Sequence, residues 1–333
     1  MKKTLSRSPR DFRKLTVGNA LPIGWAVIPF AMLFLFAIPG PGLAEQGKPT
    51  VPEKIASDHL PNSFRVTDRV ISGGLPEDEK AFAELRNLGV RTIISVDGAK
   101  PDVATAKKFG LRYVHLPHGY DGISDERARE LAKAVRELPG SIYIHCHHGK
   151  HRSPAAAATA CVTAGTLSPD DAISVLTAAG TSKNYRGLYQ SVEAARPIDA
   201  KALNELQVQF RETVEVPPLA QAMVALEHTH DHLKSMAAND WKPLPKHPDL
   251  DPAHEALLLR EHFTELLRTP EVQAQPREFI ESLEQSEKAA KALELGLQAA
   301  TLNDKRLTLA LTTVTNQCQA CHQTFRDRPL GRK

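Results

Sequence analysis

Residues 142–154 read Ile142-Tyr-Ile-His-Cys-His-His-Gly-Lys-His-Arg-Ser-Pro154, and this stretch decides the fold of the first half of the chain. Its first four residues, Ile142–His145, are typical of a buried strand. The Ala-rich segment from Pro154 onward predicts a helix. Where a strand leads through a short loop into a helix, backbone N–H groups and the positive helix end converge on one point. The stretch therefore predicts a loop that binds phosphate.

The loop carries a thiol and a guanidinium at positions suited to phosphate chemistry. Cys146 opens the loop, where the converging N–H groups stabilise a thiolate. Arg152 follows six residues later and can reach back to bind two phosphate oxygens. Ser153 fits either the helix N-cap or a hydroxyl that stabilises the leaving thiolate, and Pro154 fits the first helical position. The residues between are expected to bind substrate, with a glycine that allows close backbone approach: His147, His148, Gly149, Lys150 and His151.

This motif resembles the signature of the dual-specificity-type cysteine phosphatases, which is His-Cys, five residues, Arg, and then Ser or Thr. The resemblance covers residues 64–197. Its Gly-Lys-His-Arg segment is closest to an atypical plant and fungal group that looks like inositol pyrophosphate phosphatases, although Pro154 stands where that group usually has glycine. The resemblance implies hydrolysis of phosphate monoesters through a phosphoenzyme on Cys146, without a metal ion. The substrate stays open between a phosphotyrosine- or phosphoserine-type protein and a small polyphosphate such as an inositol phosphate.

This chemistry also needs an acid that protonates the leaving oxygen. In the phosphatases that the chain resembles, the acid is an aspartate on a loop upstream of the cysteine. Asp121 and Asp125 both lie in such a loop, residues 117–125. We favour Asp121, which has glycines close to it on both sides, and expect Asp125 or Ser124 to cap the helix that follows.

Two further patterns predict how the chain is organised. From residue 64 to 197, short Val- and Ile-rich runs alternate with helical stretches, which predicts an α/β sheet domain. The expected strands are 69–72, 92–96, 113–116 and 142–145, and the expected helices are 77–87, 125–138, 154–164, 169–179 and 185–195. A linker helix is expected at 198–216. From residue 217 to 327, four helical patterns with apolar stripes, among them 219–237, 279–297 and 307–325, predict an all-α four-helix bundle.

The last of these patterns contains Cys318-Gln-Ala-Cys321-His322, which is the attachment pattern of a c-type haem. The two thiols would form thioethers, and His322 would be the proximal iron ligand. A disulfide between Cys318 and Cys321, or an incomplete zinc site, is the alternative. The pattern predicts one covalent haem c per chain.

A long helical region that ends in this motif resembles the class II cytochromes c, the cytochrome c-prime family. Phe325-Arg326 continues the family motif, so the resemblance implies that Arg326 contacts the haem. In that family the sixth iron site is empty or is filled by a methionine of the first helix. Met223 is therefore either a ligand or a core residue. His228, His230 and His232 alternate along the same helix, and we expect them to be mostly solvated.

The N-terminus has the order of a secretory signal. Six Lys and Arg residues within the first 14 positions precede an apolar run at 20–38, and Pro-Gly-Pro-Gly-Leu-Ala44 follows. Cleavage after Ala44 is expected. Retention as a membrane anchor is the alternative, because about 19 apolar residues can span a bilayer. Residues 1–44 are thus a signal or an anchor, residues 45–63 a linker, and the remainder is expected to be exported to the periplasm.

Composition excludes several classes of protein. The 333 residues carry 42 Lys and Arg against 39 Asp and Glu, so no charge excess points to nucleic acid. Four cysteines are too few for a disulfide scaffold. Three functions remain. The first is an exported phosphatase with a phosphorylated substrate, fused to a haem domain that transfers electrons or senses and would add a redox partner. The second is a c-type cytochrome that senses redox state or a gas, with the phosphatase-like domain as a binding module. The third is an electron-transfer protein in which residues 64–197 serve as an interaction module.

Overall fold

The computed structural model describes residues 52–245, 247–299 and 301–331, all of which belong to one unit of the chain, Gly47–Lys333. The expected signal or anchor at residues 1–44, with the start of the linker, lies outside the described residues. No helix among the described residues is both long enough and apolar enough to cross a membrane.

A six-stranded sheet forms the centre of the first half, in the order β1-β2-β3-β6-β4-β5. The four expected strands are present and run parallel to one another: β3 Val70–Gly73, β6 Ser141–His145, β4 Val90–Ser95 and β5 Arg112–His115. Two antiparallel strands of two residues each, β1 Glu53–Lys54 and β2 Phe64–Arg65, extend one edge. Runs this short give no pattern in the sequence, which is why they were not expected.

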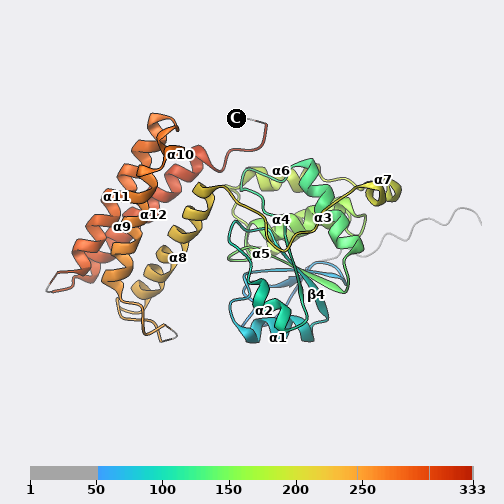
Figure 1. Ribbon diagram of the computed structural model, residues 1–333, viewed down its shortest axis with the longest axis horizontal. Helices are drawn as coiled ribbons and strands as arrows, with labels where there is room; N and C mark the ends of the chain where they lie inside the picture. Colours follow the sequence, from blue (N-terminus) through green and yellow to red (C-terminus); the bar gives the residue numbers. More distant parts are fainter. Residues whose placement is uncertain (1–51, 246, 300, 332–333) are drawn as a thin grey trace, which may run out of the picture. The chain divides into compact units, whose positions relative to one another are not determined.

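Helices cover both faces of this sheet (Figure 1). The elements are α1 Glu79–Asn87, α2 Val103–Lys108, α3 Asp125–Glu137, α4 Arg152–Thr163, α5 Pro169–Ala179 and α6 Arg186–Ala194. Successive strand residues point to opposite faces. Accordingly Ile142 and Ile144 pack in one core with α3 to α6, whereas Tyr143 packs in a second core with α1 and α2. The five helices expected in this half are confirmed, and the short α2 is additional.

The second half is helical, as the sequence predicts. After the short α7 Ala200–Glu205 come α8 Pro218–Ala238, α9 Pro252–Arg268, α10 Pro270–Gln273, α11 Arg277–Leu297 and α12 Asp304–Phe325. α9 packs against α8 and α11, and α11 packs against α12. The expected stripe of α11 is buried throughout: Phe279, Leu283, Ser286, Ala290, Leu293 and Leu297. Four long helices therefore share one apolar core.

The expected linker helix at 198–216 is wrong beyond Glu205. The chain instead runs along the outer strand of the sheet, where His115 N donates to Arg211 O at 2.9 Å and Val214 N donates to His115 Nδ1 at 3.2 Å. This segment carries the chain from the sheet to the start of α8.

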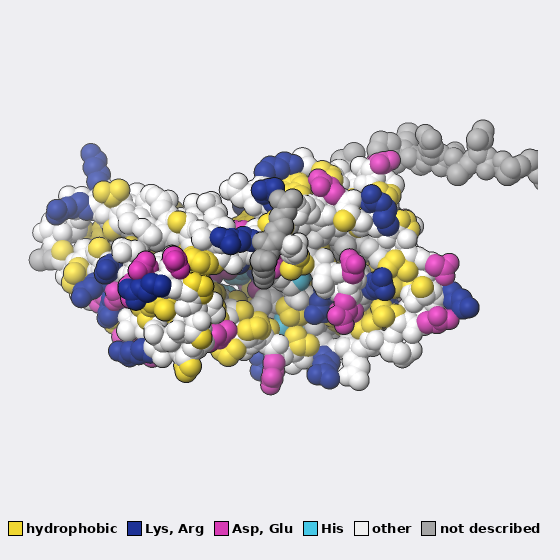
Figure 2. Space-filling model, turned by 90° about the horizontal axis from the view of Figure 1, so that it is seen from above, with side chains coloured by type: hydrophobic (Ala, Val, Ile, Leu, Met, Phe, Trp, Pro, Cys, Tyr) yellow, Lys and Arg dark blue, Asp and Glu magenta, His cyan; other side chains and the backbone are white. Residues whose placement is uncertain are grey.

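Charged side chains of both signs are interspersed over the face seen in Figure 2, without a continuous patch of one sign among the described residues there. This distribution agrees with the near-zero net charge of the sequence.

Candidate functional site

The loop between β6 and α4 places Cys146 at the carboxyl end of the parallel strands, where open α/β sheets bind their ligands. Cys146 follows β6 directly and is 3% exposed. Its Sγ lies 3.3 Å from the Oγ of Ser153, which donates a 2.9 Å hydrogen bond to the carbonyl of Gly73. A hydroxyl has a single hydrogen, so Ser153 would turn from Gly73 to stabilise a thiolate. Ser153 thus lies within reach of the thiol.

Helix α4 begins two residues earlier than the sequence indicates. Its first residue is Arg152, and His151 occupies the N-cap position without a side-chain cap hydrogen bond among the described residues. The prediction of Ser153 as N-cap and Pro154 as the first helical residue is therefore wrong. Proline is tolerated throughout this first turn because those N–H positions have no intrahelical partner. Because α4 begins earlier than expected, Arg152 itself lies at the positive end of the helix.

Arg152 is held by a carboxylate that no sequence pattern indicates. Its Nη2 lies 2.9 Å from Oδ2 of Asp97, and the same oxygen accepts a 2.7 Å hydrogen bond from the backbone N–H of His147. Burial alone would raise the pKa of Asp97, but the charge of Arg152 and the hydrogen bond from Ala99 N outweigh it and lower the pKa to about 2. Asp97 is therefore ionised at neutral pH and fixes both ends of the loop.

The guanidinium of Arg152 has a buried donor that is unsatisfied. Its Nε is buried and has no hydrogen-bond partner among the described residues. A buried cationic donor without an acceptor is costly, and a bound anion removes that cost. This atom, at the start of a helix and beside a thiol, is the strongest indication that the loop binds a phosphate group.

Gly149 is required for the shape of the loop. Its φ is +69°, a left-handed conformation that glycine adopts without strain. A Cβ at this position would also lie 2.4 Å from the backbone nitrogen of Gly74. The close approach expected of Gly149 is therefore made to the segment after β3.

Asp121 lines the same cavity as Arg152. Its backbone carbonyl accepts a 2.9 Å hydrogen bond from Leu330 N, which fastens the loop before α3. The ring of the neighbouring Tyr120 lies 4.5 Å from the guanidinium carbon of Arg152. The acid candidate and the arginine therefore line one cavity, and the Tyr120 ring packs on the arginine.

Asp125 occupies a different position from Asp121. It is the exposed first residue of α3, and Ser124 is the N-cap, with its Oγ accepting from Arg127 N at 3.2 Å. Of the two candidate caps, Ser124 is correct and Asp125 is wrong. Of the two carboxylates, Asp121 lines the cavity of Arg152 and Asp125 does not.

The basic side chains of the loop lie in three different environments. His147 Nε2 lies 3.0 Å from Oδ2 of Asp231 on α8, and His148 Nε2 lies 3.4 Å from the same oxygen. The ring of His151 lies 4.5 Å from that of Tyr185, and burial lowers its pKa to about 4. Lys150 is exposed. The two first histidines therefore face carboxylates of the helical region.

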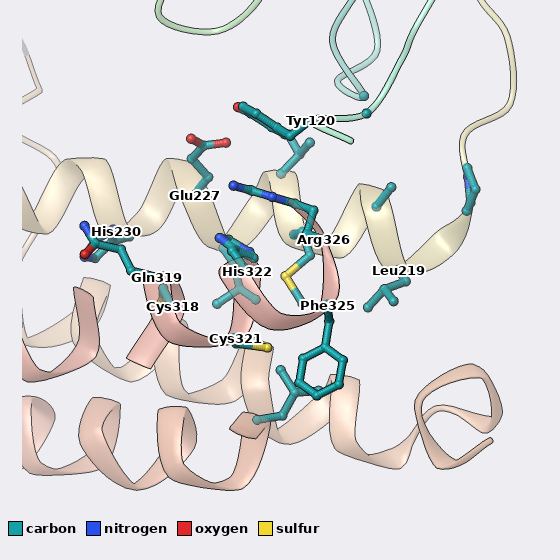
Figure 3. Close-up of a pocket in the computed structure, with 18 of the residues that line it drawn as sticks. Tyr120, Leu219, Glu227, His230, Cys318, Gln319, Cys321, His322, Phe325 and Arg326 are labelled. Carbon is teal, nitrogen blue, oxygen red and sulfur yellow. The ribbon is translucent and has the colours of Figure 1, made fainter. Parts of the chain in front are cut away.

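A cavity of about 870 Å³ continues from Arg152 and Asp121 into the helical region. Figure 3 shows its far end, where Cys318 and His322 of α12 face α8. Its walls there are mostly apolar and come from α8, α11 and α12: Met223, Leu226, Phe279, Leu283, Cys318, Cys321 and Phe325. The Cys318–His322 motif and the phosphatase-like loop thus open into one cavity, a relation that no sequence pattern showed.

The titratable groups of the Cys318–His322 motif are neutral. Burial lowers the pKa of His322 to about 3 and raises the pKa of Cys318 to about 11. Both motif cysteines are free thiols in the structure, so the disulfide alternative is not formed. A neutral imidazole and two free thiols are the forms that bind a metal and react with a porphyrin.

Arg326, expected to contact a haem, also contacts the first half of the chain. Its guanidinium carbon lies 4.0 Å from the Tyr120 ring (Figure 3). Its Nε donates to Asp327 Oδ1 at 2.7 Å. Since Tyr120 also contacts Arg152, a chain of cation–π contacts joins the end of α12 to the candidate active site.

The expectation that the three histidines of α8 are mostly solvated is wrong. The His228 ring lies 4.8 Å from that of His147, His230 Nε2 lies 2.9 Å from Thr315 Oγ1, and His232 Nδ1 lies 2.8 Å from Glu255 Oε2. Alternate positions on a helix do face different sides, but each of these three histidines meets a partner residue on its own side of α8. His230 also lines the cavity, as Met223 does.

Three groups at the site were missed from the sequence: Asp97, Tyr120 and Asp231. One signal could have found Asp97, because it lies just beyond β4, at the same sheet edge as Cys146. Asp231 gave no such signal, since its partner His147 is 84 residues away on another element.

No protein-family profile matches the chain, and no curated protein matches it significantly. Among solved structures, P. aeruginosa TpbA is 20% identical over 46% of this chain and 94% of that chain, with a TM-score of 0.39. A cysteine-to-serine variant of TpbA in complex with pTyr gives 20% identity, 47% and 95% coverage, and the same TM-score of 0.39. A DUF442 protein from Shewanella putrefaciens CN-32 is 19% identical over 43% of this chain and 99% of that chain, with a TM-score of 0.35. Similarities at this level do not assign the chain to a family.

Proposed function

We propose that residues 64–197 hydrolyse phosphate monoesters through a covalent intermediate on Cys146. The observation that carries the proposal is the buried Nε of Arg152, which has no partner among the described residues, on the loop that begins with Cys146. A phosphoryl group bound there would accept from this donor and would lie within the positive field of the α4 N-terminus.

In the first step, the Cys146 thiolate attacks phosphorus, and the bond from phosphorus to the ester oxygen breaks. Asp121, in its protonated form, donates a proton to the departing oxygen, so the alcohol or phenol leaves neutral. Arg152 stabilises the charge on the equatorial oxygens, and Asp97 holds Arg152 in place.

In the second step, water attacks the phosphorus of the cysteinyl phosphate while Asp121, now a carboxylate, accepts the proton. The bond from sulfur to phosphorus breaks, and inorganic phosphate leaves with the thiolate regenerated. Ser153 Oγ, 3.3 Å from Sγ, donates to the leaving thiolate after turning from Gly73. No metal ion takes part in either step.

We also propose that the helical region carries one covalent haem, bound to Cys318 and Cys321 with His322 as the iron ligand. The residues fit the group, because both thiols are free, the imidazole is neutral, and the cavity beside them is largely apolar. A volume of about 870 Å³ also lies within the range of sites for cofactors. The haem would supply electron transfer or binding of a small molecule, and Met223 or His230 lies on the cavity wall as a candidate second ligand.

Export to the periplasm is part of this proposal and rests on residues 1–44, which lie outside the described residues. A periplasmic location agrees with covalent haem attachment, which takes place after export. The phosphorylated substrate would then be an extracytoplasmic protein or a small polyphosphate, and the haem would add a redox partner.

The test is hydrolysis of an aryl phosphate by the full chain and by two cysteine variants. Cys146→Ser should lose turnover and keep binding of inorganic phosphate, whereas Cys161→Ala, which changes a cysteine buried in α4, should retain turnover. Equal activity of Cys146→Ser and the wild type would refute the mechanism. Phosphate binding without any turnover in the wild type would favour a haem sensor with a phosphate-binding module.

A further inference from the structure

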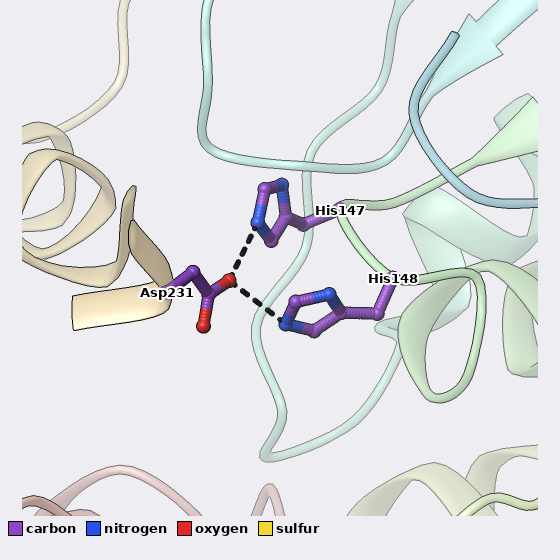
Figure 4. A group of neighbouring side chains, drawn as sticks. All are labelled: His147, His148 and Asp231. Carbon is purple, nitrogen blue, oxygen red and sulfur yellow. Dashed lines mark hydrogen bonds and ion pairs between the residues drawn. The ribbon is translucent and has the colours of Figure 1, made fainter. Parts of the chain in front are cut away.

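Two histidines of the phosphatase-like loop and one aspartate of α8 converge on a single point (Figure 4). His147 Nε2 lies 3.0 Å and His148 Nε2 lies 3.4 Å from the same oxygen, Oδ2 of Asp231. The three donor atoms all lie within 4.8 Å of one another. Two imidazole nitrogens and a carboxylate oxygen are the donors that zinc prefers over magnesium or calcium.

The separations agree with those of a zinc site. Zinc binds nitrogen at 2.0–2.1 Å and carboxylate oxygen at 2.0–2.2 Å in a tetrahedral arrangement, so two of its ligand atoms lie about 3.3 Å apart. The two distances to Asp231 Oδ2, 3.0 and 3.4 Å, bracket this value. The two imidazole nitrogens lie within 4.8 Å of each other.

The surroundings of the three groups suit a bound cation. Glu227 Oε1 lies 3.6 Å from His148 Nε2, which adds a second carboxylate, and the His228 ring lies 4.8 Å from the His147 ring. Lys234 pairs with the other oxygen of Asp231, Oδ1, and so leaves Oδ2 directed toward the histidines. The side chains of His147 and Asp231 are 14% and 21% exposed, whereas that of His148 is 42% exposed, which leaves an entry path on its side.

We propose that His147, His148 and Asp231 form a zinc site that ties the Cys146–Arg152 loop to helix α8. The fourth position would be open to water or to Glu227. Such an ion is not part of the hydrolytic chemistry. It would restrain the loop, since its ligands come both from the segment next to Cys146 and from a helix more than 80 residues away. Slower turnover with bound zinc is a consequence that rests on the proposed phosphatase function. The zinc-binding site itself does not rest on it.

The binding test is equilibrium dialysis of the full chain against zinc, with bound metal measured by atomic emission. Wild-type protein should bind one zinc per chain at this site, and Asp231→Asn and His147→Gln should each weaken that binding at least about 10-fold. His254→Gln, which removes an exposed histidine of α9, is the matched control and should bind as the wild type does. Magnesium in excess should not displace the zinc. Equal zinc binding by wild type and both variants would overturn the proposal, with circular dichroism to confirm that the variants are folded.

The regulatory test compares turnover of an aryl phosphate with and without zinc. Zinc should slow the wild type more than it slows Asp231→Asn, which keeps all the proposed catalytic groups. Equal slowing of both proteins would contradict the restraint of the loop. If no protein turns over the substrate, the proposed function fails, while the dialysis result still decides the zinc site.

Discussion

Replacing Asp97 by asparagine tests whether a buried carboxylate organises the candidate active site. Asn can still accept a hydrogen bond, but it removes the carboxylate that pairs with the buried charge of Arg152. The carboxyl pKa is lowered from 3.8 to about 2 despite burial, which corresponds to about 2 kcal/mol of folding free energy at neutral pH. Breaking a buried ion pair costs about 3–5 kcal/mol, so with the remaining hydrogen bond we expect a loss of about 2–4 kcal/mol.

The assay is urea unfolding of the wild type and of Asp97→Asn at a series of pH values between 2 and 8, with circular dichroism as the readout. Because the folded pKa is depressed, the stabilisation is fully present above the unfolded pKa of 3.8 and is lost as the pH falls through about 2. The difference between the two proteins should therefore be constant at pH 5–8 and shrink below pH 4. Asp58→Asn, at an exposed carboxylate outside the helices and strands, is the matched control and should unfold as the wild type does. Equal stability of Asp97→Asn and wild type at pH 7, or a difference that does not change with pH, would refute this reasoning.

Three further predictions follow from the cavity and its contacts. Asp121→Asn should lower the rate of aryl phosphate hydrolysis by roughly 10²–10⁴ if it is the acid, and Asp125→Asn should leave it unchanged; the reverse order would assign the acid to Asp125. Protein made in a host that attaches haem should keep its haem spectrum after denaturation in pyridine, and Cys318→Ala with Cys321→Ala should abolish it; a colourless wild type would rule out the haem. Arg326→Gln removes a cation–π contact worth about 0.5–2 kcal/mol and should change kcat/KM for the aryl phosphate by a few-fold to about 30-fold; an unchanged kcat/KM would show that the end of α12 does not influence the active site.

Much of the fold could be predicted because its elements carry strong local patterns. The parallel strands are buried on both faces and therefore read as runs of Val and Ile, such as Val90–Ser95. The long helices carry apolar stripes, and α11 shows its stripe over the whole expected length. β1 and β2 could not be predicted, because two residues cannot show a period.

The site could be predicted only where its residues are close in sequence. Cys146, Arg152 and Ser153 belong to one loop and the start of one helix, so a single motif shows them together. The partner of Arg152, Asp97, is 55 residues away, and only the order of strands in the sheet places it there. The partners of the α8 histidines could not be predicted for a similar reason. The residues that these histidines contact belong to other elements, so the sequence of α8 alone does not show them.

The measurement that tests the central claim most directly is capture of the phosphoenzyme. The full chain would be mixed with an aryl phosphate, quenched in acid within the first turnovers, digested and analysed by mass spectrometry. The proposed mechanism predicts one phosphoryl group on the peptide that contains Cys146, present in Asp121→Asn and absent from Cys146→Ser. Turnover of the substrate with no phosphoryl group on Cys146 at any quench time, or with the group on another residue, would contradict it.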